Sequence, residues 1–166
     1  MKFLRYIIII LVLTGAGFGI YKIITAPKLV EGEIAAKNGL HWHAHVSILI
    51  DGKEESIPAD IGVTGDMGAG GDPMELHTHD TSGIVHAEFS GLVSKDQLRI
   101  GKLFQAWGKD FSKDSVLGHK AENGHTISMT VNGIQNTDFE NYEITNVGTF
   151  DAGGLGKVDE IVITYK

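Results

Sequence analysis

The sequence predicts a strand-rich α+β domain, a small sandwich or open barrel with one main helix, preceded by an N-terminal transmembrane helix. Residues 40–50, L-H-W-H-A-H-V-S-I-L-I, place two sets of side chains in alternation, with the period of two that a β-strand has. The pairs Asp51-Gly52 and Asn132-Gly133 are strong signals for hairpin turns. Apolar residues recur at helical spacing between residues 100 and 111. Many short strands beside one helix are typical of an α+β domain.

Residues 1–26 are expected to place the chain at a membrane. Lys2 and Arg5 precede an uncharged run over residues 6–21, and a spanning helix needs about 20 mostly apolar residues. We expect a retained single-pass anchor, with a signal peptide cleaved within residues 14–18 as the alternative. In both cases the basic residues stay in the cytoplasm and the C-terminal domain lies outside it.

The composition excludes several kinds of chemistry. The chain has no cysteine, which removes disulfides, iron–sulfur clusters, thiolate zinc sites, blue copper and cysteine nucleophiles. Three of the 14 basic residues precede residue 27, so the other 11 face all 21 acidic residues and give that part a charge of −10. This acidity argues against a nucleic-acid partner. Residues 27–39 are expected to be a linker, and residues 40–166 an extracytoplasmic His-rich β domain.

The remaining elements follow from local patterns. Ser94 to Gln97 have the form of a capping box before the helix, and Gly101 and Gly108 restrict its regular part to about Lys102 to Trp107. Half of residues 62–71 are glycine, which favours a flexible surface loop, or alternatively a lid beside a site, where Met67 and Met74 would offer soft ligands to Cu(I). Further strands are expected at residues 54–57, 76–80, 84–89, 126–131 and 160–165.

Six of the eight histidines fall in three short segments with metal-ligand spacing. In an extended segment, residues two apart share a face, so a His-x-His pair can chelate one ion and a neighbouring strand can complete the site. Three histidines on one strand do not easily reach one ion, so His41 is either peripheral or part of a second site. The predicted metal ligands are His43, His45, His77, His79, His86 and Glu88, with Asp80 as an acceptor that orients an imidazole.

The donor types narrow the choice of metal. Imidazole ligands suit Zn(II) and Cu(II), so a transition metal ion, copper or zinc, is the expected cofactor. Adding the Glu88 carboxylate widens the choice to Fe(II), Mn(II) and Ni(II).

Four strings carry a resemblance: H-W-H-A-H, I-P-A-D-I-G, H-T-H-D-T-S-G-I-V-H-A-E and I-G-K-L-F-Q-A-W-G. With them the chain resembles an uncharacterised family of small exported or membrane-anchored prokaryotic proteins with HxHxH, HTHDxxGxxHxE and FxxWG motifs. The resemblance covers roughly residues 40–111 and, more loosely, the C-terminal strands. The chain departs from the family in its glycine-rich insert between Ile61 and His77. The resemblance implies that these residues act as a unit, and it supplies no reaction.

Three classes of function are compatible with these patterns. The favoured class is a membrane-anchored extracytoplasmic metal-binding protein, for copper or zinc handling or as an accessory subunit of a membrane complex. A mononuclear metalloenzyme is the second: a zinc hydrolase with Glu88 as general base, or a non-haem iron enzyme using His86 and Glu88 with His119 or His125. The third is a cell-surface interaction domain whose histidines respond to pH.

Overall fold

The computed structural model describes residues 2–25, 30–64, 72–73 and 75–166 of a chain that forms two compact units, residues 1–31 and 32–166. The first unit contains helix α1 (Lys2–Thr25), so its helical form is as predicted. Among the described residues, no helix has both the length and the apolar character that crossing a membrane requires. The anchor therefore stays a prediction.

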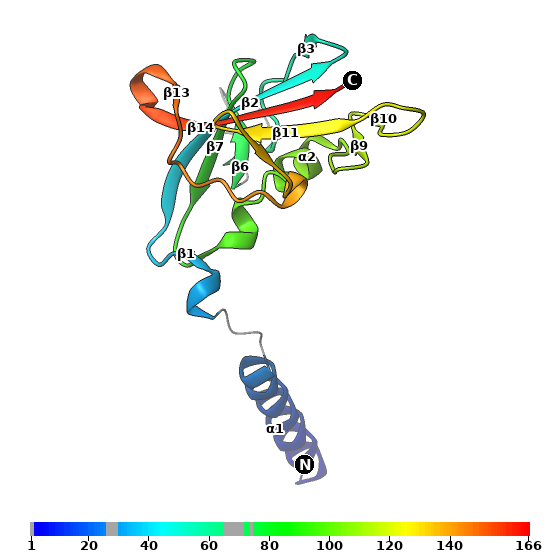
Figure 1. Cartoon of the computed structure of the whole chain (residues 1–166). Helices are drawn as coiled ribbons and strands as arrows, with labels where there is room; N and C mark the ends of the chain where they lie inside the picture. Colours follow the sequence, from blue (N-terminus) through cyan, green and yellow to red (C-terminus); the bar gives the residue numbers. More distant parts are fainter. Residues whose placement is uncertain (1, 26–29, 65–71, 74) are drawn as a thin grey trace. The chain divides into compact units, whose positions relative to one another are not determined.

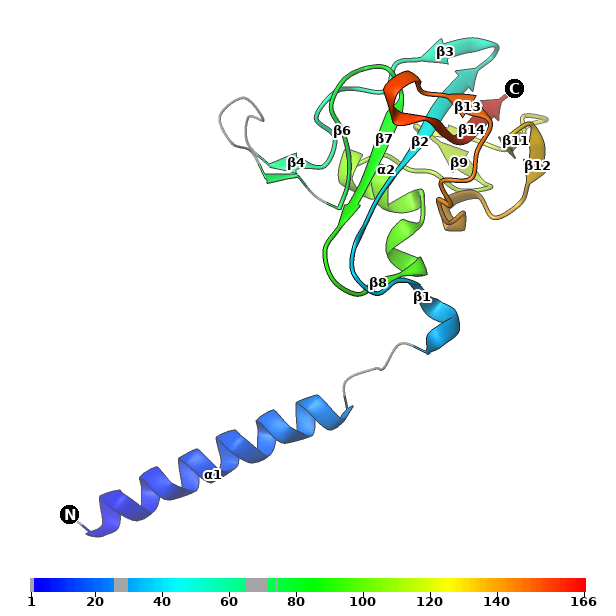
Figure 2. The same ribbon diagram turned by 90° about the vertical axis from the view of Figure 1, so that its left-hand side faces the viewer.

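The second unit is built around strand β2 (Leu40–Ile50), the central strand of an open eight-stranded sheet (Figure 1). Along its first half, β2 pairs antiparallel with β7 (Ile84–Phe89). Strand β7 pairs in turn with the short β6 (Leu76–Thr78), and Figure 2 shows these three strands side by side. The three segments that carry the clustered histidines are thus neighbours in one sheet.

The other edge of β2 is covered by the C-terminal part of the chain. Strand β14 (Lys157–Tyr165) pairs parallel with β2 and is followed by β11 (Ile127–Val131) and β12 (Ile134–Asn136). Two short strands extend the sheet, β3 (Lys53–Glu55) beside β2 and β13 (Phe150–Asp151) beside β14. The parallel pair joins the two ends of the domain, which no local pattern predicts.

The strand-rich α+β class is confirmed, whereas the small sandwich or open barrel stays a prediction. The strands within the described ranges form one eight-stranded sheet and three two-stranded sheets, all of them open, and close no barrel. These pairs are β1 (Ile34–Ala36) with β8 (Val93–Ser94), β4 (Val63–Thr64) with β5 (Asp72–Pro73), and β9 (Ser115–Val116) with β10 (His119–Lys120). Part of the expected linker, residues 27–39, therefore contributes β1 to the second unit.

One face of the main sheet forms the hydrophobic core. Ala44, Val46 and Ile48 of β2 are almost wholly buried, together with Leu103 and Phe104 of helix α2. Helix α2 (Gly101–Trp107) ends at Gly108, whose φ of 70° is the left-handed conformation that terminates helices. The predicted capping box is present, with the Ser94 backbone donating to Gln97 Oε1 at 2.8 Å, but it opens the separate 3₁₀ turn η3 (Lys95–Leu98).

The two hairpin turns are confirmed by their backbone angles. Asp51 and Gly52 have φ values of 49° and 78°, and Asn132 and Gly133 have φ values of 53° and 77°. Two consecutive positive φ values are the requirement of a type I′ turn, which the Asx-Gly pair meets at little steric cost. The first turn joins β2 to β3 and the second joins β11 to β12.

Candidate metal centre

The strand register places three imidazoles in one row across the sheet. His43 of β2 pairs with His86 of β7, and His86 pairs with His77 of β6. Directly opposed residues on neighbouring strands point to the same face, with Cβ atoms about 4.5–5.5 Å apart. The row lies on the face of β2 opposite the hydrophobic core, because the core takes the alternate residues.

Four side chains around this row form what we term the inner group: His77, His79, His86 and Glu88. Each offers a ligand atom, and these atoms all lie within 4.8 Å of one another. His77 Nε2 is 3.2 Å from His79 Nε2 and 3.9 Å from Glu88 Oε1. His86 Nδ1 is 3.7 Å from the same carboxylate oxygen. The inner group therefore joins β6, β7 and the residue just beyond β6.

These separations fit a small metal ion. Two nitrogens bound tetrahedrally to zinc at about 2.0–2.1 Å lie roughly 3.3 Å apart, close to the 3.2 Å between His77 and His79. Glu88 is set slightly wider, and its side chain is 39% exposed, so a rotation of its carboxylate can close the remaining gap. A hydrogen bond between the two imidazoles, one of them protonated on Nε2, also satisfies 3.2 Å. The distance alone therefore does not distinguish a metal site from a hydrogen bond, and buried imidazole nitrogens without hydrogen-bond partners provide a second criterion.

Two imidazoles of the row carry buried nitrogens that lack a hydrogen-bond partner within the described residues. They are His43 Nε2 and His86 Nδ1. Buried polar side-chain atoms are nearly always paired, because an unmade hydrogen bond costs about 1–3 kcal/mol. Binding of metal by each of these nitrogens would supply the missing interactions.

The electrostatic environment keeps the same rings neutral. Burial lowers the pKa of His86 to about 4, and the neighbouring imidazoles of His79, His43 and His77 act in the same direction against Glu88. Burial also lowers the pKa of His43, as does His41. A neutral imidazole has a free lone pair, which is the form that binds metal, so protons do not compete for these rings near pH 7.

Strand β6 is held in place by the preceding loop. The Thr78 backbone N–H donates to the Ile61 carbonyl at 3.1 Å, and the Asp60 N–H donates to the Thr78 carbonyl at 3.1 Å. Gly62, with φ of 72°, passes so close that a Cβ there would overlap the Leu76 carbonyl oxygen and approach His77. The loop thus covers the outer edge of β6, where His77 is fully buried.

A second set of side chains, which we term the outer group, consists of His41, His43 and His86. Their ligand atoms also lie within 4.8 Å of one another. The His43 and His86 rings are 4.6 Å apart in an edge-to-face arrangement, and the His41 and His43 rings are 4.7 Å apart. His41 Nε2 also lies 3.0 Å from Glu88 Oε1. The sequence left two alternatives for His41, a peripheral position or a second site, and the structure brings it together with His43 and His86 in this second group.

Two other predicted residues, His45 and Asp80, lie outside both groups. His45 is stacked on Phe150 of β13, with ring centroids 3.8 Å apart, and its ligand role stays a prediction. Asp80 accepts a hydrogen bond from the Ser82 backbone at 2.8 Å. Met67 and Met74 fall outside the described residues, as does most of the glycine-rich stretch.

The two remaining histidines lie elsewhere. His119 and His125 both pack against Tyr165, each with ring centroids 5.0 Å apart. Tyr165 pairs with Ile50 at the C-terminal end of β2, whereas the histidine row crosses its N-terminal half. The structure does not bring either histidine to His86 and Glu88 as an iron site would require.

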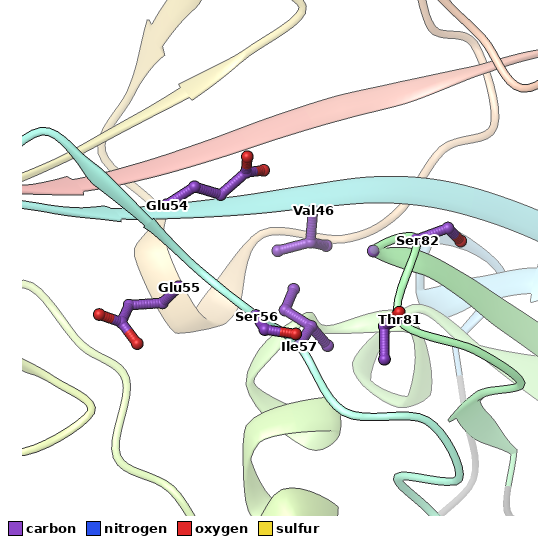
Figure 3. A pocket seen from close by; sticks show the side chains of 8 residues that line it. Val46, Glu54, Glu55, Ser56, Ile57, Thr81 and Ser82 are labelled. Atoms are coloured by element: carbon purple, nitrogen blue, oxygen red, sulfur yellow. The ribbon is translucent and has the colours of Figure 1, made fainter.

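A separate hollow of about 260 Å³ lies at the edge of β2, between the part that pairs with β7 and the part that pairs with β3 (Figure 3). Its walls carry Glu54 and Glu55 on one side and the turn at residues 81–83 on the other. No histidine lines it. The candidate metal centre is therefore a set of side chains on the sheet surface and is distinct from this hollow.

Comparison of the chain with protein-family models, with curated proteins and with solved structures finds no match. The family resemblance based on the three histidine segments therefore stays a prediction. The functional argument depends on the geometry of the site alone.

Proposed function

We propose that this chain is a membrane-anchored, extracytoplasmic metal-binding protein that handles copper or zinc or serves as an accessory subunit of a membrane complex. The observation that carries the proposal is the inner group, in which three imidazoles and one carboxylate from two strands and a turn offer ligand atoms within 4.8 Å of one another. Imidazole nitrogen with one carboxylate oxygen is a donor set that zinc and copper accept readily.

The surroundings of the inner group support binding more than catalysis. Glu88 is the carboxylate within the group, and its Oε1 lies 3.7 Å from His86 Nδ1 and 3.9 Å from His77 Nε2, so it can complete the ligand set. A zinc hydrolase needs a carboxylate that stays free to act as general base beside the metal-bound water. With Glu88 as a ligand, the inner group is closed, as in structural or carrier sites.

A mononuclear zinc hydrolase remains the second candidate because Glu88 is partly exposed. In that case the three inner imidazoles hold the ion and Glu88 activates water. A Glu88→Gln variant separates the two functions. A carrier would lose affinity for the ion, whereas a hydrolase would keep its ion and lose activity.

The location of the protein is part of the same proposal. The uncharged run at residues 6–21, behind Lys2 and Arg5, supports a single-pass anchor with residues 32–166 outside the cytoplasm. Protease treatment of intact cells tests it: the anchored protein should sediment with membranes and lose its C-terminal domain to external protease. Recovery of the intact chain in the soluble fraction would contradict the location.

Elemental analysis of the tag-free, full-length protein tests metal binding. The parent should retain or rebind zinc or copper close to stoichiometry, and a His77→Ala/His79→Ala variant should lose it. A His119→Ala/His125→Ala variant is the matched control, because it removes two histidines outside both groups and should bind like the parent. If neither the parent nor the control binds a transition metal, the proposal is wrong.

A further inference from the structure

The inner and outer groups have one residue in common, His86. It lies between them in the sheet, opposite His43 on one neighbouring strand and opposite His77 on the other. Its ring is 4.6 Å from the His43 ring and 4.3 Å from the His79 ring, and it is edge-to-face to both. The two groups are therefore adjacent and share a side chain.

An imidazole has two nitrogens, and each can bind a metal ion. His86 Nδ1, at 3.7 Å from Glu88 Oε1, belongs to the inner group. This assignment leaves Nε2 for an ion held by the outer group. When both nitrogens bind metal, the ring N–H proton is released to solvent and the ring becomes an imidazolate bridge.

The outer group has the features of an open site. Its three ligand residues are all histidines, and with Glu88 assigned to the inner ion, although its Oε1 lies 3.0 Å from His41 Nε2, they leave a fourth position for water or another ligand. Its side chains range from His43, which is 8% exposed, to His41, which is 59% exposed. The inner group spans a similar range, from the fully buried His77 to the exposed His79.

His43 supplies the independent observation for this second position. It is not in the inner group, yet its Nε2 is buried without a hydrogen-bond partner in the described part of the chain. An ion in the inner group alone would leave this nitrogen unsatisfied. An ion held by the outer group would satisfy it.

We propose that the protein binds two transition metal ions, an inner one and an outer one, bridged by His86. This inference rests on the proposed function, since it presupposes that the inner group binds metal. It adds a second site and a shared ligand, and it assigns His41 and His43 to the outer ion.

Titration of the full-length protein with Cu(II), followed by electron paramagnetic resonance, tests the bridge. The parent should bind two ions, and the signal at two equivalents should be well below that of two isolated Cu(II) ions because the imidazolate couples their spins. A His41→Ala/His43→Ala variant should bind one ion with the full signal of one isolated Cu(II). The His119→Ala/His125→Ala variant should behave like the parent.

The outcomes separate this inference from the proposed function. One ion in the parent, lost in the His77→Ala/His79→Ala variant, would overturn the second site and leave the proposed function intact. Two ions with additive signals would overturn the bridge. No bound ion would contradict the proposed function as well. The single variant His41→Ala changes an exposed residue and serves as a control in case the His41→Ala/His43→Ala variant does not fold. It should lower the affinity for the outer ion only.

Discussion

Two clusters of buried polar groups lie on neighbouring strands, and they differ in how their hydrogen bonds are satisfied. The Asp159 carboxylate on β14 is fully buried and accepts hydrogen bonds from Asn132, Tyr142 and Thr145, at 2.8–3.3 Å. Across the sheet, His43 and His86 keep buried ring nitrogens that no described residue satisfies. Residues of the chain itself satisfy the hydrogen bonds of the Asp159 cluster. The ring nitrogens of His43 and His86 would need a ligand from outside the chain to satisfy them.

The difference also appears in the donors and acceptors themselves. Burial raises the pKa of Tyr142, and the Asp159 charge adds to this effect, so its hydroxyl stays protonated and donates to Asp159 at 3.0 Å. The histidine row brings together neutral acceptors that have few donors to meet. The comparison indicates that the Asp159 cluster stabilises the fold, whereas the histidine row could hold a metal ion, as we propose, at some cost to the metal-free protein.

The largest expected effect is the loss of stability when Asp159 is replaced. Asp159→Ala leaves the Tyr142 hydroxyl, the Thr145 backbone N–H and the Asn132 amide without their acceptor, and the free energy of unfolding should fall by roughly 3 kcal/mol or more. Urea denaturation monitored by circular dichroism measures it. Asp114→Ala is the control, since Asp114 is an exposed partner of Lys113 and should change stability little. Equal losses for both variants would contradict a structural role for the Asp159 cluster.

The next effect concerns added metal. Zinc at 100 times its Kd should raise the free energy of unfolding of the parent by about 2.7 kcal/mol relative to the protein in chelator. The His77→Ala/His79→Ala variant should show no such gain, because its inner group is incomplete. Asp159→Ala should keep the gain, since its cluster does not contact the ion. If Asp159→Ala also abolished the increase in stability on adding zinc, the Asp159 cluster and the inner group would not be independent.

The sequence predicts the strands, the turns and the side chains that share a face, but it does not predict how distant strands pair. Alternation in β2 and the Asx-Gly turns predict strands and hairpins because they are local. The His-x-His and His-x-Glu spacings predict which side chains share a face. The register that aligns His43 with His86 depends on the pairing of β2 with β7 across 43 residues, which no local pattern specifies. For the same reason the parallel pairing of β2 with β14 is found only in the structure.

The Asp159 cluster and the position of His45 show the same limit. Nothing around Asp159 in the sequence distinguishes it from an exposed acid, and its partners come from two separate segments, at Asn132 and at residues 142–145. His45 follows the pattern of His41 and His43, yet the chain brings Phe150 against it instead of another ligand. The spacing along one strand predicts which side chains share a face of the sheet. Which residues those side chains contact depends on the neighbouring strands.

A smaller effect comes from the loop that holds His77. Gly62 and Gly91 both have a φ of 72°, but only at Gly62 would a Cβ overlap backbone, at the Leu76 carbonyl. Gly62→Ala and Gly91→Ala therefore share the cost of the left-handed conformation, about 1–2 kcal/mol. Gly62→Ala should cost more and should also weaken zinc binding, because it displaces β6. Isothermal titration calorimetry measures the affinity, and equal affinities in the two variants would contradict the role of this contact.

The smallest effect is the pH dependence of the metal-free protein. Since the pKa of His86 is about 4 in the fold and near 6.5 when unfolded, the unfolded chain binds the extra proton first as the pH falls. Stability in chelator should therefore decrease from about pH 6.5 towards pH 4. A His86→Gln variant should lose part of this slope, and His125→Gln serves as control. Identical slopes in all three proteins would show that His86 is not buried as described.

The central claim is that His77, His79, His86 and Glu88 bind one ion together, and X-ray absorption of the full-length protein with one equivalent of zinc tests it most directly. We expect a four-coordinate shell of nitrogen and oxygen at about 2.0–2.1 Å with multiple scattering from three imidazoles. His79→Ala should lower the imidazole count by one. A shell of water and carboxylate oxygens without imidazole scattering would contradict the account.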